Sequence, residues 1–288
     1  MAEKIATREA YGNALAEFGV DEKIVVFDAD LSKSTKTAAF QKKYPDRFFN
    51  MGIAEANMMC AAAGMATCGK ISFASTFAIF AAGRAWEQVR NSICYPKLNV
   101  KIGATHAGIT VGEDGASHQM LEDISNMRVL PNMTVISPAD AIETRLAVKA
   151  AIEYDGPVYL RLGRLAVPVI FDETYKFEWG KGVQIREGSD VTIIATGLMV
   201  HEAIKAYDIL KEKGISARVI NIHTIKPLDD AIIEKAARET GAVVTAEEHN
   251  VIGGLGSAVC ESLASTYPVH VLRIGIQDTF GRSGKPPL

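Results

Sequence analysis

The sequence has no long apolar run, no excess of one charge and few cysteines. Its 288 residues contain no window that approaches the roughly 18 uninterrupted apolar residues of a membrane helix. The first ten residues, MAEKIATREA, contain no apolar stretch of the kind found in a secretory signal peptide. The 31 basic and 34 acidic side chains leave a net charge of −3, which argues against nucleic acid or a membrane as the main partner. We therefore expect a cytoplasmic protein.

Cysteine is too sparse and too scattered for a metal site or a disulfide framework. The four cysteines, Cys60, Cys68, Cys94 and Cys260, lack C-x-x-C spacing and stand among Ala, Ile and Val residues, so we expect buried, reduced thiols. With 48% hydrophobic and 23% charged residues the composition is that of an ordinary globular protein. The length predicts about two domains that fold without a covalent or metal crosslink.

Short β-branched runs alternate with stretches of helical period in the first part of the chain. Compact apolar runs predict strands at residues 23–27, 100–103, 134–137 and 158–162. Helices are expected between them, at residues 55–68, 77–95 and 139–154. This alternation is typical of a parallel α/β sheet.

A second unit is expected after a stretch without either period. That stretch begins near residue 168, and we place the boundary at about 172–186. Strands are predicted beyond it at 190–195, 217–222, 242–246 and 269–274, with a helix that starts near Val200 and stops at Gly214. The prediction is an α/β fold of two doubly wound domains, 1–175 and 186–288, in which ligands bind beyond the carboxyl ends of the strands.

Glu55 is the first candidate for chemistry. It enters the first turn of an apolar helix, where a carboxylate also complements the helix dipole and could be purely structural. The helix that follows is rich in Ala, Met and Cys on every side, which predicts that it is buried. A buried glutamate must find a partner or take up a proton, because an isolated buried charge is costly.

Phe77 and Phe80 stand one turn apart at the predicted start of the next buried helix. Such a pair is commonly core packing, and it also suits an aromatic wall for a flat heterocycle. The spacing alone leaves both readings open.

Two histidines and an aspartate are expected together at one edge of the sheet. His106 follows a predicted strand, and Asp114 and His118 lie in the glycine-rich loop GEDGASHQ at 112–119. Loops on a rigid scaffold often carry function. Arg164 follows another strand end, where a solvated arginine is the ordinary interpretation. Its planar guanidinium also suits phosphate, so a phosphorylated substrate near the histidines is a second interpretation.

A second glycine-rich stretch, GGLG at 253–256, does not fit the dinucleotide pattern G-x-G-x-x-G. We interpret it as a tight turn or a subunit contact. His223 and His249 nearby are minor site candidates.

Taken in chain order, these segments resemble the carboxyl-terminal half of transketolase, a thiamine diphosphate enzyme. The resemblance runs from residue 6 to about 285. The motifs that carry it are DADLSKS at 28–34, MGIAE at 51–55, STFAIF at 75–80, GEDGASHQ at 112–119, LPNM at 130–133 and DGP at 155–157. It implies a pyrimidine-binding domain over 1–175 and a transketolase C-terminal domain over 186–288.

The resemblance also implies roles for individual residues. Glu55 matches the glutamate that bonds N1′ of the cofactor's aminopyrimidine, and Phe80 matches the ring that stacks on it, with Phe77 beside it and Asp30 at the cofactor interface. Glu55 and His118 are the implied catalytic residues. The residues matched to the sugar phosphate are Ser34, His106, Asp114, His118 and Arg164. The implied reaction is reversible transfer of a two-carbon ketol unit from a ketose phosphate to an aldose phosphate, as in the pentose phosphate pathway.

Two departures from the family pattern matter. Gly-Asp-Gly, which binds Mg²⁺ and the cofactor's diphosphate in this family, does not occur in the sequence. The resemblance therefore implies a split transketolase, active only with a separate N-terminal subunit that carries the diphosphate and magnesium site, in an α2β2 heterotetramer. Gly83 stands where many relatives carry a tyrosine, which predicts a pyrimidine pocket that is closed differently or is more open.

Three alternatives share this architecture. Deoxyxylulose phosphate synthase and the β subunit of 2-oxoacid dehydrogenase E1 have the same two domains, and the latter is also a separate chain. The histidine-containing loop and Arg164 favour a phosphosugar over a 2-oxoacid. A non-catalytic assembly subunit is expected to lose the glutamate or the stacking ring, and both are present.

Overall fold

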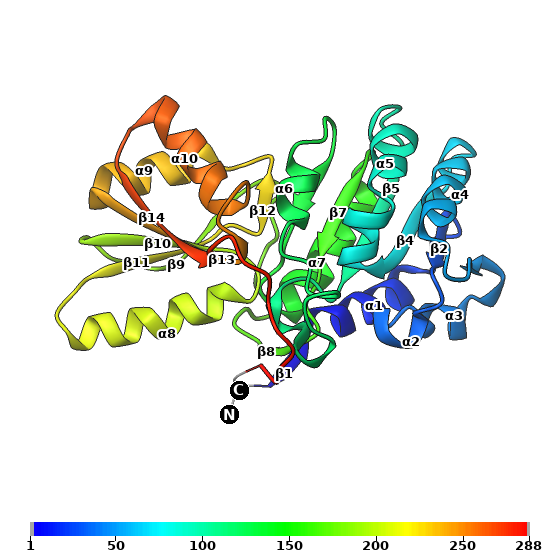
Figure 1. Cartoon of the computed structure of the whole chain (residues 1–288), viewed down its shortest axis with the longest axis horizontal. Coiled ribbons are helices and arrows are strands. Elements are labelled where there is room, and N and C mark those ends of the chain that lie inside the picture. The colour runs from blue at the N-terminus through cyan, green and yellow to red at the C-terminus, as the bar shows by residue number, and fades with distance from the viewer. Residues whose placement is uncertain (1–2, 287–288) are drawn as a thin grey trace.

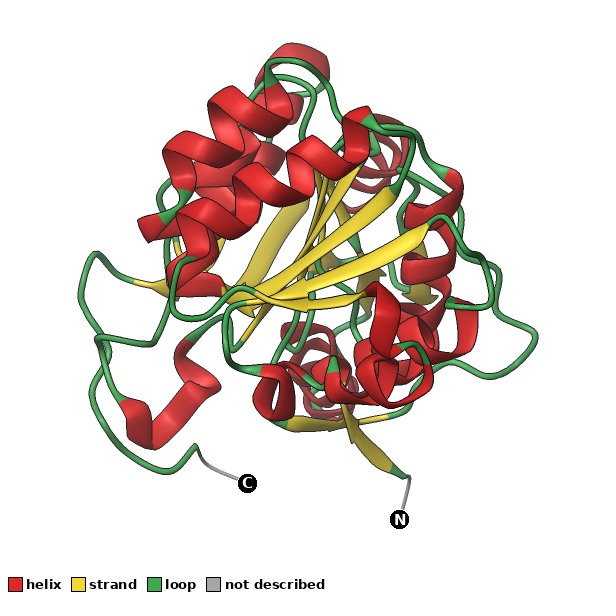
Figure 2. Cartoon of the chain, turned by 90° about the vertical axis from the view of Figure 1, so that its right-hand side faces the viewer, coloured by secondary structure: helices red, strands yellow, loops and turns green. Residues whose placement is uncertain are grey.

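The computed structural model describes residues 3–286, which form two large sheets with helices on both faces of each, and one small two-stranded sheet (Figure 1). In the view turned by 90°, helices lie above and below the strands (Figure 2). The predicted α/β fold of two doubly wound units is confirmed, while the limits at 175 and 186 stay a prediction. No helix within residues 3–286 is long and apolar enough to cross a membrane.

The first unit is built on a seven-stranded sheet of order β12-β6-β7-β5-β4-β2-β3. All of its neighbours pair in parallel except β12, which runs antiparallel to β6. The strands are β2 (Ile24–Asp28), β3 (Phe48–Asn50), β4 (Ile71–Phe77), β5 (Val100–Thr105), β6 (Thr134–Ile136), β7 (Val158–Arg161) and β12 (Thr224–Lys226). A separate antiparallel pair joins β1 (Lys4–Ala6) to β8 (Ala166–Pro168).

Two groups of helices cover this sheet. One face packs on α1 (Thr7–Phe18), α3 (Ala38–Lys43) and α7 (Ala141–Glu153). The other face packs on α4 (Glu55–Thr67), α5 (Trp86–Gln88) and α6 (Asp123–Arg128), and the short α2 (Ser32–Thr35) lies in the loop after β2. Burial of both faces explains why the strands read as continuous apolar runs.

The second unit has a five-stranded sheet of order β14-β13-β10-β11-β9. In Figure 1, α9 and α10 lie above this sheet and α8 lies below it. Its elements are β9 (Val183–Arg186), β10 (Val191–Ala195), α8 (Met199–Glu212), β11 (Ala217–Asn221), α9 (Asp230–Thr240), β13 (Ala242–Asn250), α10 (Leu255–Thr266) and β14 (His270–Ile276).

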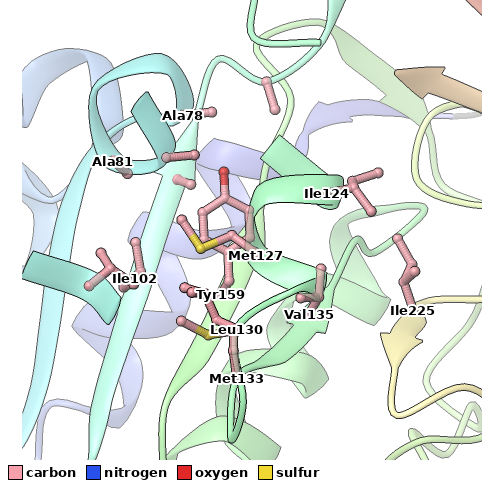
Figure 3. Packing of buried hydrophobic residues seen from close by; sticks show 14 of the residues in the cluster. Ala78, Ala81, Ile102, Ile124, Met127, Leu130, Met133, Val135, Tyr159 and Ile225 are labelled. Atoms are coloured by element: carbon pink, nitrogen blue, oxygen red, sulfur yellow. The ribbon is translucent and has the colours of Figure 1, made fainter. Parts of the chain in front are cut away.

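One apolar core runs through both units. Figure 3 shows Ile225 of β12 beside Val135 of β6 and Ile124 of α6. The same cluster continues to Leu255 and Val259 of α10. The second unit contributes both an edge strand and core side chains to the first, so the two units share one packed core.

The sequence-based expectation for residues 77–95 is wrong at its start. Phe77 is the last residue of β4, a central strand that pairs with β2 and β5, and not the first residue of a helix. The helical segment after it is broken by two π-helical turns, Phe80–Arg84 and Val89–Cys94, with α5 between them. Buried hydroxyl residues such as Ser72 and Ser75 obscure the strand pattern, because polar side chains stand at fully buried positions of this strand.

The expectation that α4 and the cysteines are buried is also wrong in part. The buried residues of α4 lie on one face, which includes Glu55 and Met58, while Cys60 on the other face is exposed. Cys68 is exposed, Cys260 is partly exposed and Cys94 is buried, and all four thiols are free. The outer face of α4 is apolar in composition because of its small residues, yet Cys60 and Gly64 on it are exposed.

Candidate active site

The candidate residues gather at the carboxyl edge of the seven-stranded sheet. Phe77 ends β4 and is paired in register with Thr105, which ends β5, so His106 follows directly beside Phe77. Asp28 ends β2, which is hydrogen-bonded to the other side of β4. Parallel strands bring these ends together, which is why segments far apart in the sequence meet here.

Glu55 is buried and paired with an arginine that was not expected there. Nη1 of Arg84 lies 3.1 Å from Oε1 and 3.0 Å from Oε2 of Glu55. The Glu55 side chain is 1% exposed and that of Arg84 is 53% exposed. The guanidinium also lies 4.4 Å from the centre of the Phe80 ring. The buried glutamate therefore has the partner that its burial requires.

Four aromatic rings form a continuous group next to this pair. The rings of Phe77 and Phe80 are stacked, with centroids 5.8 Å apart and planes 10° apart. The imidazole of His106 stacks on Phe77 at 3.8 Å, and His118 stands edge-on to Phe80 at 5.8 Å. The structure thus joins the predicted aromatic wall to both predicted histidines.

His106 is held in a strained backbone conformation, with φ at 57°. Its Nδ1 lies 2.9 Å from Oγ1 of Thr105, and its Nε2 lies 3.0 Å from Nη1 of Arg8. Burial, together with the positive charges of Arg8 and Arg164, lowers the pKa of His106 to about 3. The imidazole is therefore neutral at physiological pH.

Two arginines create positive potential at this edge. Arg8 also donates to the carbonyl of Ser34 at 2.9 Å, and burial and the charge of Arg164 lower its pKa. Arg164 donates to the carbonyl of Val111 and lies 3.4 Å from Glu113 and 4.0 Å from Asp114. The predicted residues Ser34, Asp114 and Arg164 therefore border one basic patch, which we call the arginine patch (Arg8 and Arg164).

The loop that carries Asp114 and His118 is braced by the end of the chain. Nε2 of Gln119 donates to the carbonyl of Ile109 at 3.1 Å and to that of Arg282 at 3.1 Å. The segment after β14 runs back from the second unit toward the first (Figure 1). Gly112, with φ at 81°, lies so close to this segment that an added Cβ would be 2.9 Å from Cδ of Pro286.

Asp30 is a predicted site residue that lies apart from the aromatic group. Its carboxylate is exposed and accepts from Nδ2 of Asn50 at 2.8 Å, without contact to the aromatic group. Asp28, two residues earlier, is instead the buried organiser of the loop. It accepts from the amide of Leu31 at 2.6 Å and from the hydroxyls of Thr35 at 2.6 Å and Thr37 at 2.8 Å.

The sequence reasoning missed Arg8 and Arg84. Arg8 lies in the first turn of α1, where a positive charge opposes the helix dipole, and that mismatch is the signal that could have marked it. Arg84 gives no comparable signal, because only the fold brings it to Glu55, 29 residues away.

The glycine-rich stretch at 253–256 is a turn at the start of α10. The amides of Leu255 and Gly256 donate to the buried Glu247 at 2.7 and 2.8 Å. A Cβ on Gly254 would lie 1.9 Å from Oε2 of Glu247, so the close approach requires glycine. His223 and His249 are buried, and desolvation lowers the pKa of each, which indicates packing roles.

Residues 3–286 contain no cluster of three or more His, Cys, Asp and Glu side chains that could hold a metal ion. The acidic residues of the site, Glu113 and Asp114, face Arg164 instead.

Known proteins resemble this chain over nearly its whole length. Residues 3–169 match the family model described as transketolase, pyrimidine binding domain, and residues 180–288 match transketolase, C-terminal domain. The chain is 56% identical over 282 residues to a putative transketolase C-terminal section from Methanocaldococcus jannaschii, covering 96% of this chain and 88% of the relative. It is 45% identical over 278 residues to a 6-deoxy-6-sulfo-D-fructose transketolase subunit from Clostridium sp. strain MSTE9, covering 96% and 86%.

A solved structure with the same fold is described as an inactive beta4 tetramer of a split gene transketolase. Its sequence is 60% identical to this chain, the TM-score is 0.91, and the match covers 97% of this chain and 92% of that one.

Proposed function

This chain belongs to the transketolase family, and we propose that it is the subunit of a two-chain transketolase that supplies the pyrimidine side of the cofactor site. The family is thiamine diphosphate dependent, and its members support a transferase-type enzyme. The observation that carries the proposal is one sheet edge that joins a buried carboxylate, two stacked phenylalanine rings and the arginine patch.

The residues present fit the pyrimidine half of thiamine diphosphate. A planar guanidinium already lies over the Phe80 ring and donates to Glu55, so the site accepts a flat group that carries an N–H donor. When bound, the cofactor supplies a nucleophilic carbon that takes up a two-carbon unit from a ketose. Glu55 would hold a proton shared with the pyrimidine nitrogen, and its burial would strengthen that hydrogen bond. Phe80 and Phe77 would fix the plane of the ring.

The arginine patch suits the anionic end of the substrate. Hydrogen bonds from guanidinium groups to phosphate are charge-assisted and often bidentate. Arg164 lies 4.0 Å from Asp114, and the charges of Arg8 and Arg164 both act on His106. Ser34 lies on the same side through its carbonyl contact with Arg8. We infer that a phosphorylated sugar lies between this patch and the aromatic group, with Asp114 reading its hydroxyl configuration.

The two histidines have different roles in proton transfer. His106 is neutral and both of its ring nitrogens are engaged, with Thr105 and Arg8, so it orients Arg8 and does not carry a proton to the substrate. His118 has one ring nitrogen bonded to Oγ of Ser117 at 3.0 Å and lies partly exposed beside Phe80. Its other nitrogen is the better placed group for proton transfer to a substrate oxygen.

The proposed partner is an N-terminal transketolase subunit that carries the diphosphate and magnesium site. Apolar side chains near Glu55 support a partner on this face, because Ile53 is 79% exposed and Phe49 is 37% exposed. The relative of similar length that is named as a C-terminal section, and the beta4 tetramer described as inactive, agree with a chain that needs another. We propose an α2β2 heterotetramer with pentose phosphate pathway sugars as substrates.

The proposal is tested by measuring binding and turnover with and without the partner. The chain alone should bind thiamine diphosphate weakly and without dependence on Mg²⁺, whereas the assembled pair should bind it tightly only with Mg²⁺. The pair should convert xylulose 5-phosphate plus ribose 5-phosphate. Tight magnesium-dependent binding by the chain alone would contradict the partner assignment, and turnover of pyruvate alone would favour a 2-oxoacid dehydrogenase.

The anion that the arginine patch prefers needs its own assay, because one relative is named for a sulfosugar. A sugar sulfonate and the matching sugar phosphate compared at equal concentration separate these substrates by kcat/KM. We expect preference for the phosphate.

A further inference from the structure

Arg84 covers the carboxylate that the proposed function assigns to the cofactor. Glu55 is 1% exposed although it stands at the beginning of α4, at the sheet edge. The guanidinium of Arg84 bonds both of its oxygens and at the same time lies 4.4 Å from the Phe80 ring centre. One planar group therefore uses the hydrogen-bond acceptor and the aromatic face together, which are the two features assigned to the aminopyrimidine.

Glu55 depends on this arginine. Within residues 3–286 its side chain has no other hydrogen-bond donor than Arg84. A buried carboxylate that loses its partner without a replacement is destabilised, so the form with Arg84 turned away is a minor population until another N–H donor stabilises it. Another N–H donor could therefore replace Arg84 at the Glu55 carboxylate.

Arg84 is placed so that it can leave. Its side chain is 53% exposed on the solvent side, so the guanidinium can turn into water without crossing packed core. It ends the π-helical turn Phe80–Arg84, in which the amide of Ala85 bonds the carbonyl of Phe80. Such turns often lie at functional sites. Gly83 before it leaves open space, because the nearest atom to an added Cβ is 3.9 Å away.

From these contacts we propose that Arg84 is a displaceable placeholder for the aminopyrimidine of the cofactor, an inference that rests on the proposed function. In the chain alone the guanidinium closes over Glu55 and Phe80 and keeps the buried carboxylate paired. The incoming pyrimidine takes over both contacts, and Arg84 turns to solvent. Only the fraction of molecules with Arg84 displaced is competent to bind, so the arginine lowers the apparent affinity of the site.

Binding of the free aminopyrimidine fragment tests the proposal without turnover. The probe is 4-amino-5-hydroxymethyl-2-methylpyrimidine, titrated calorimetrically into the full chain. Replacing Arg84 by Met keeps the length of the stem and removes the planar donor. We expect Arg84→Met to bind the fragment at least about tenfold more tightly than the wild type, because the competitor is gone. Arg84→Lys keeps the charge but not the plane, and we expect an intermediate gain.

A matched control and a second readout separate the outcomes. Arg90 is an exposed arginine six residues further on that bonds Asn91, so Arg90→Met should leave the fragment affinity at the wild-type value. If Arg84→Met does not fold, Arg84→Lys carries the test, and thermal unfolding identifies that case. Equal or weaker binding by the folded variant would overturn the placeholder role and assign Arg84 to support of Glu55.

Failure of the proposed function is distinguishable from failure of this inference. If neither the variants nor the assembled pair bind the fragment or thiamine diphosphate, the pyrimidine site itself is wrong, and the placeholder role falls with it. If the assembled pair binds thiamine diphosphate while Arg84→Met shows no gain, only the role of Arg84 is wrong.

Discussion

Nη1 of Arg8 lies 3.0 Å from Nε2 of His106, and this contact fixes the proton of the imidazole. A guanidinium can only donate, so Nε2 is the acceptor and the ring proton is on Nδ1, where it donates to Thr105 Oγ1 at 2.9 Å. The pair thus presents a neutral histidine beside a cation, at the edge where the sugar phosphate is proposed to bind.

Replacing Arg8 by Gln should weaken binding of the phosphate group. We expect kcat/KM for a phosphorylated aldose to fall about 10- to 100-fold, since a charge-assisted hydrogen bond contributes roughly 1.5–3 kcal/mol. An unphosphorylated aldehyde should lose much less. Arg145→Gln is the control, because Arg145 pairs with Glu17 at the surface of α7. Equal losses for both aldehydes would show that Arg8 supports the fold and does not bind the phosphate.

His106 should not titrate near neutral pH. Its pKa is lowered to about 3, chiefly by burial, so the NMR signal of its ring carbon should stay constant from pH 8 to pH 5. The pKa in the folded state is below the unfolded value of 6.5, so the unfolded chain binds more protons between these two values. The contribution of this group to the free energy of unfolding is fully present above pH 6.5 and falls as the pH drops toward 3. A titration midpoint near 6.5 for the His106 signal would contradict the Arg8 contact.

Replacing Glu55 by Gln should abolish most of the turnover in the assembled pair. The amide cannot share a proton with the pyrimidine nitrogen, so we expect kcat to fall about 10²- to 10⁴-fold. Gln can still accept a hydrogen bond, so thiamine diphosphate should bind within about tenfold of the wild-type affinity. Unchanged turnover would favour a non-catalytic assembly subunit.

The fold was predictable from the sequence where buried positions leave a run or a period of apolar residues. Runs such as those of β2 and β5 are apolar because both faces of the sheet are covered, and α8 shows its buried face at Val200 and Ala203. β4 was hidden because hydroxyl side chains inside a central strand look polar, and the Ala-rich segment after Phe77 reads as one helix. Local pattern cannot reveal where two π-helical turns interrupt such a segment.

The site was predictable where a motif concentrates unusual residues, and not where the fold alone creates the contact. His106, Asp114 and His118 stand in adjoining loops, and the structure brings them to one edge with Phe80 and Arg164. Arg8 is 98 residues from His106, and Arg84 is 29 residues from Glu55. Neither separation matches a helical or strand period, so these contacts follow only from the folded arrangement of the elements.

Lys101 offers a stability test far from the site's chemistry. It is fully buried in β5, and its Nζ donates to the carbonyls of Tyr154 and Gly156 at 2.7 Å each. Replacing it by Met leaves both carbonyls without that donor, so the free energy of unfolding should fall by about 1–3 kcal/mol. Urea unfolding measures the change, and Lys149→Met on the exposed side of α7 should stay within about 0.5 kcal/mol of the wild type. Equal stability of the two variants would show that water replaces the lysine at no cost.

Glu143 ties the two units together and should make their stability depend on pH. It is buried at the start of α7 and accepts from the amide of Ala139 at 2.7 Å, the hydroxyl of Tyr175 at 2.7 Å and Nδ2 of Asn221 at 2.8 Å. Burial is the main cause that raises its pKa to about 7, above the value of 4.5 in the unfolded chain. Because the folded chain then binds more protons, the stability from this group is complete below pH 4.5 and is lost as the pH rises through 7.

Glu143→Gln removes this titration and keeps the size of the side chain. Between pH 5 and pH 8 the wild type should lose about 1–3 kcal/mol of unfolding free energy relative to the variant. Urea unfolding at both pH values measures the difference, and Glu153→Gln at the exposed end of α7 should follow the wild type. Identical pH dependence of the wild type and Glu143→Gln would mean that the three donors hold the carboxylate ionised throughout. In that case Tyr175 and Asn221, from the linking segment and from β11, would hold a permanent charge at the boundary between the units.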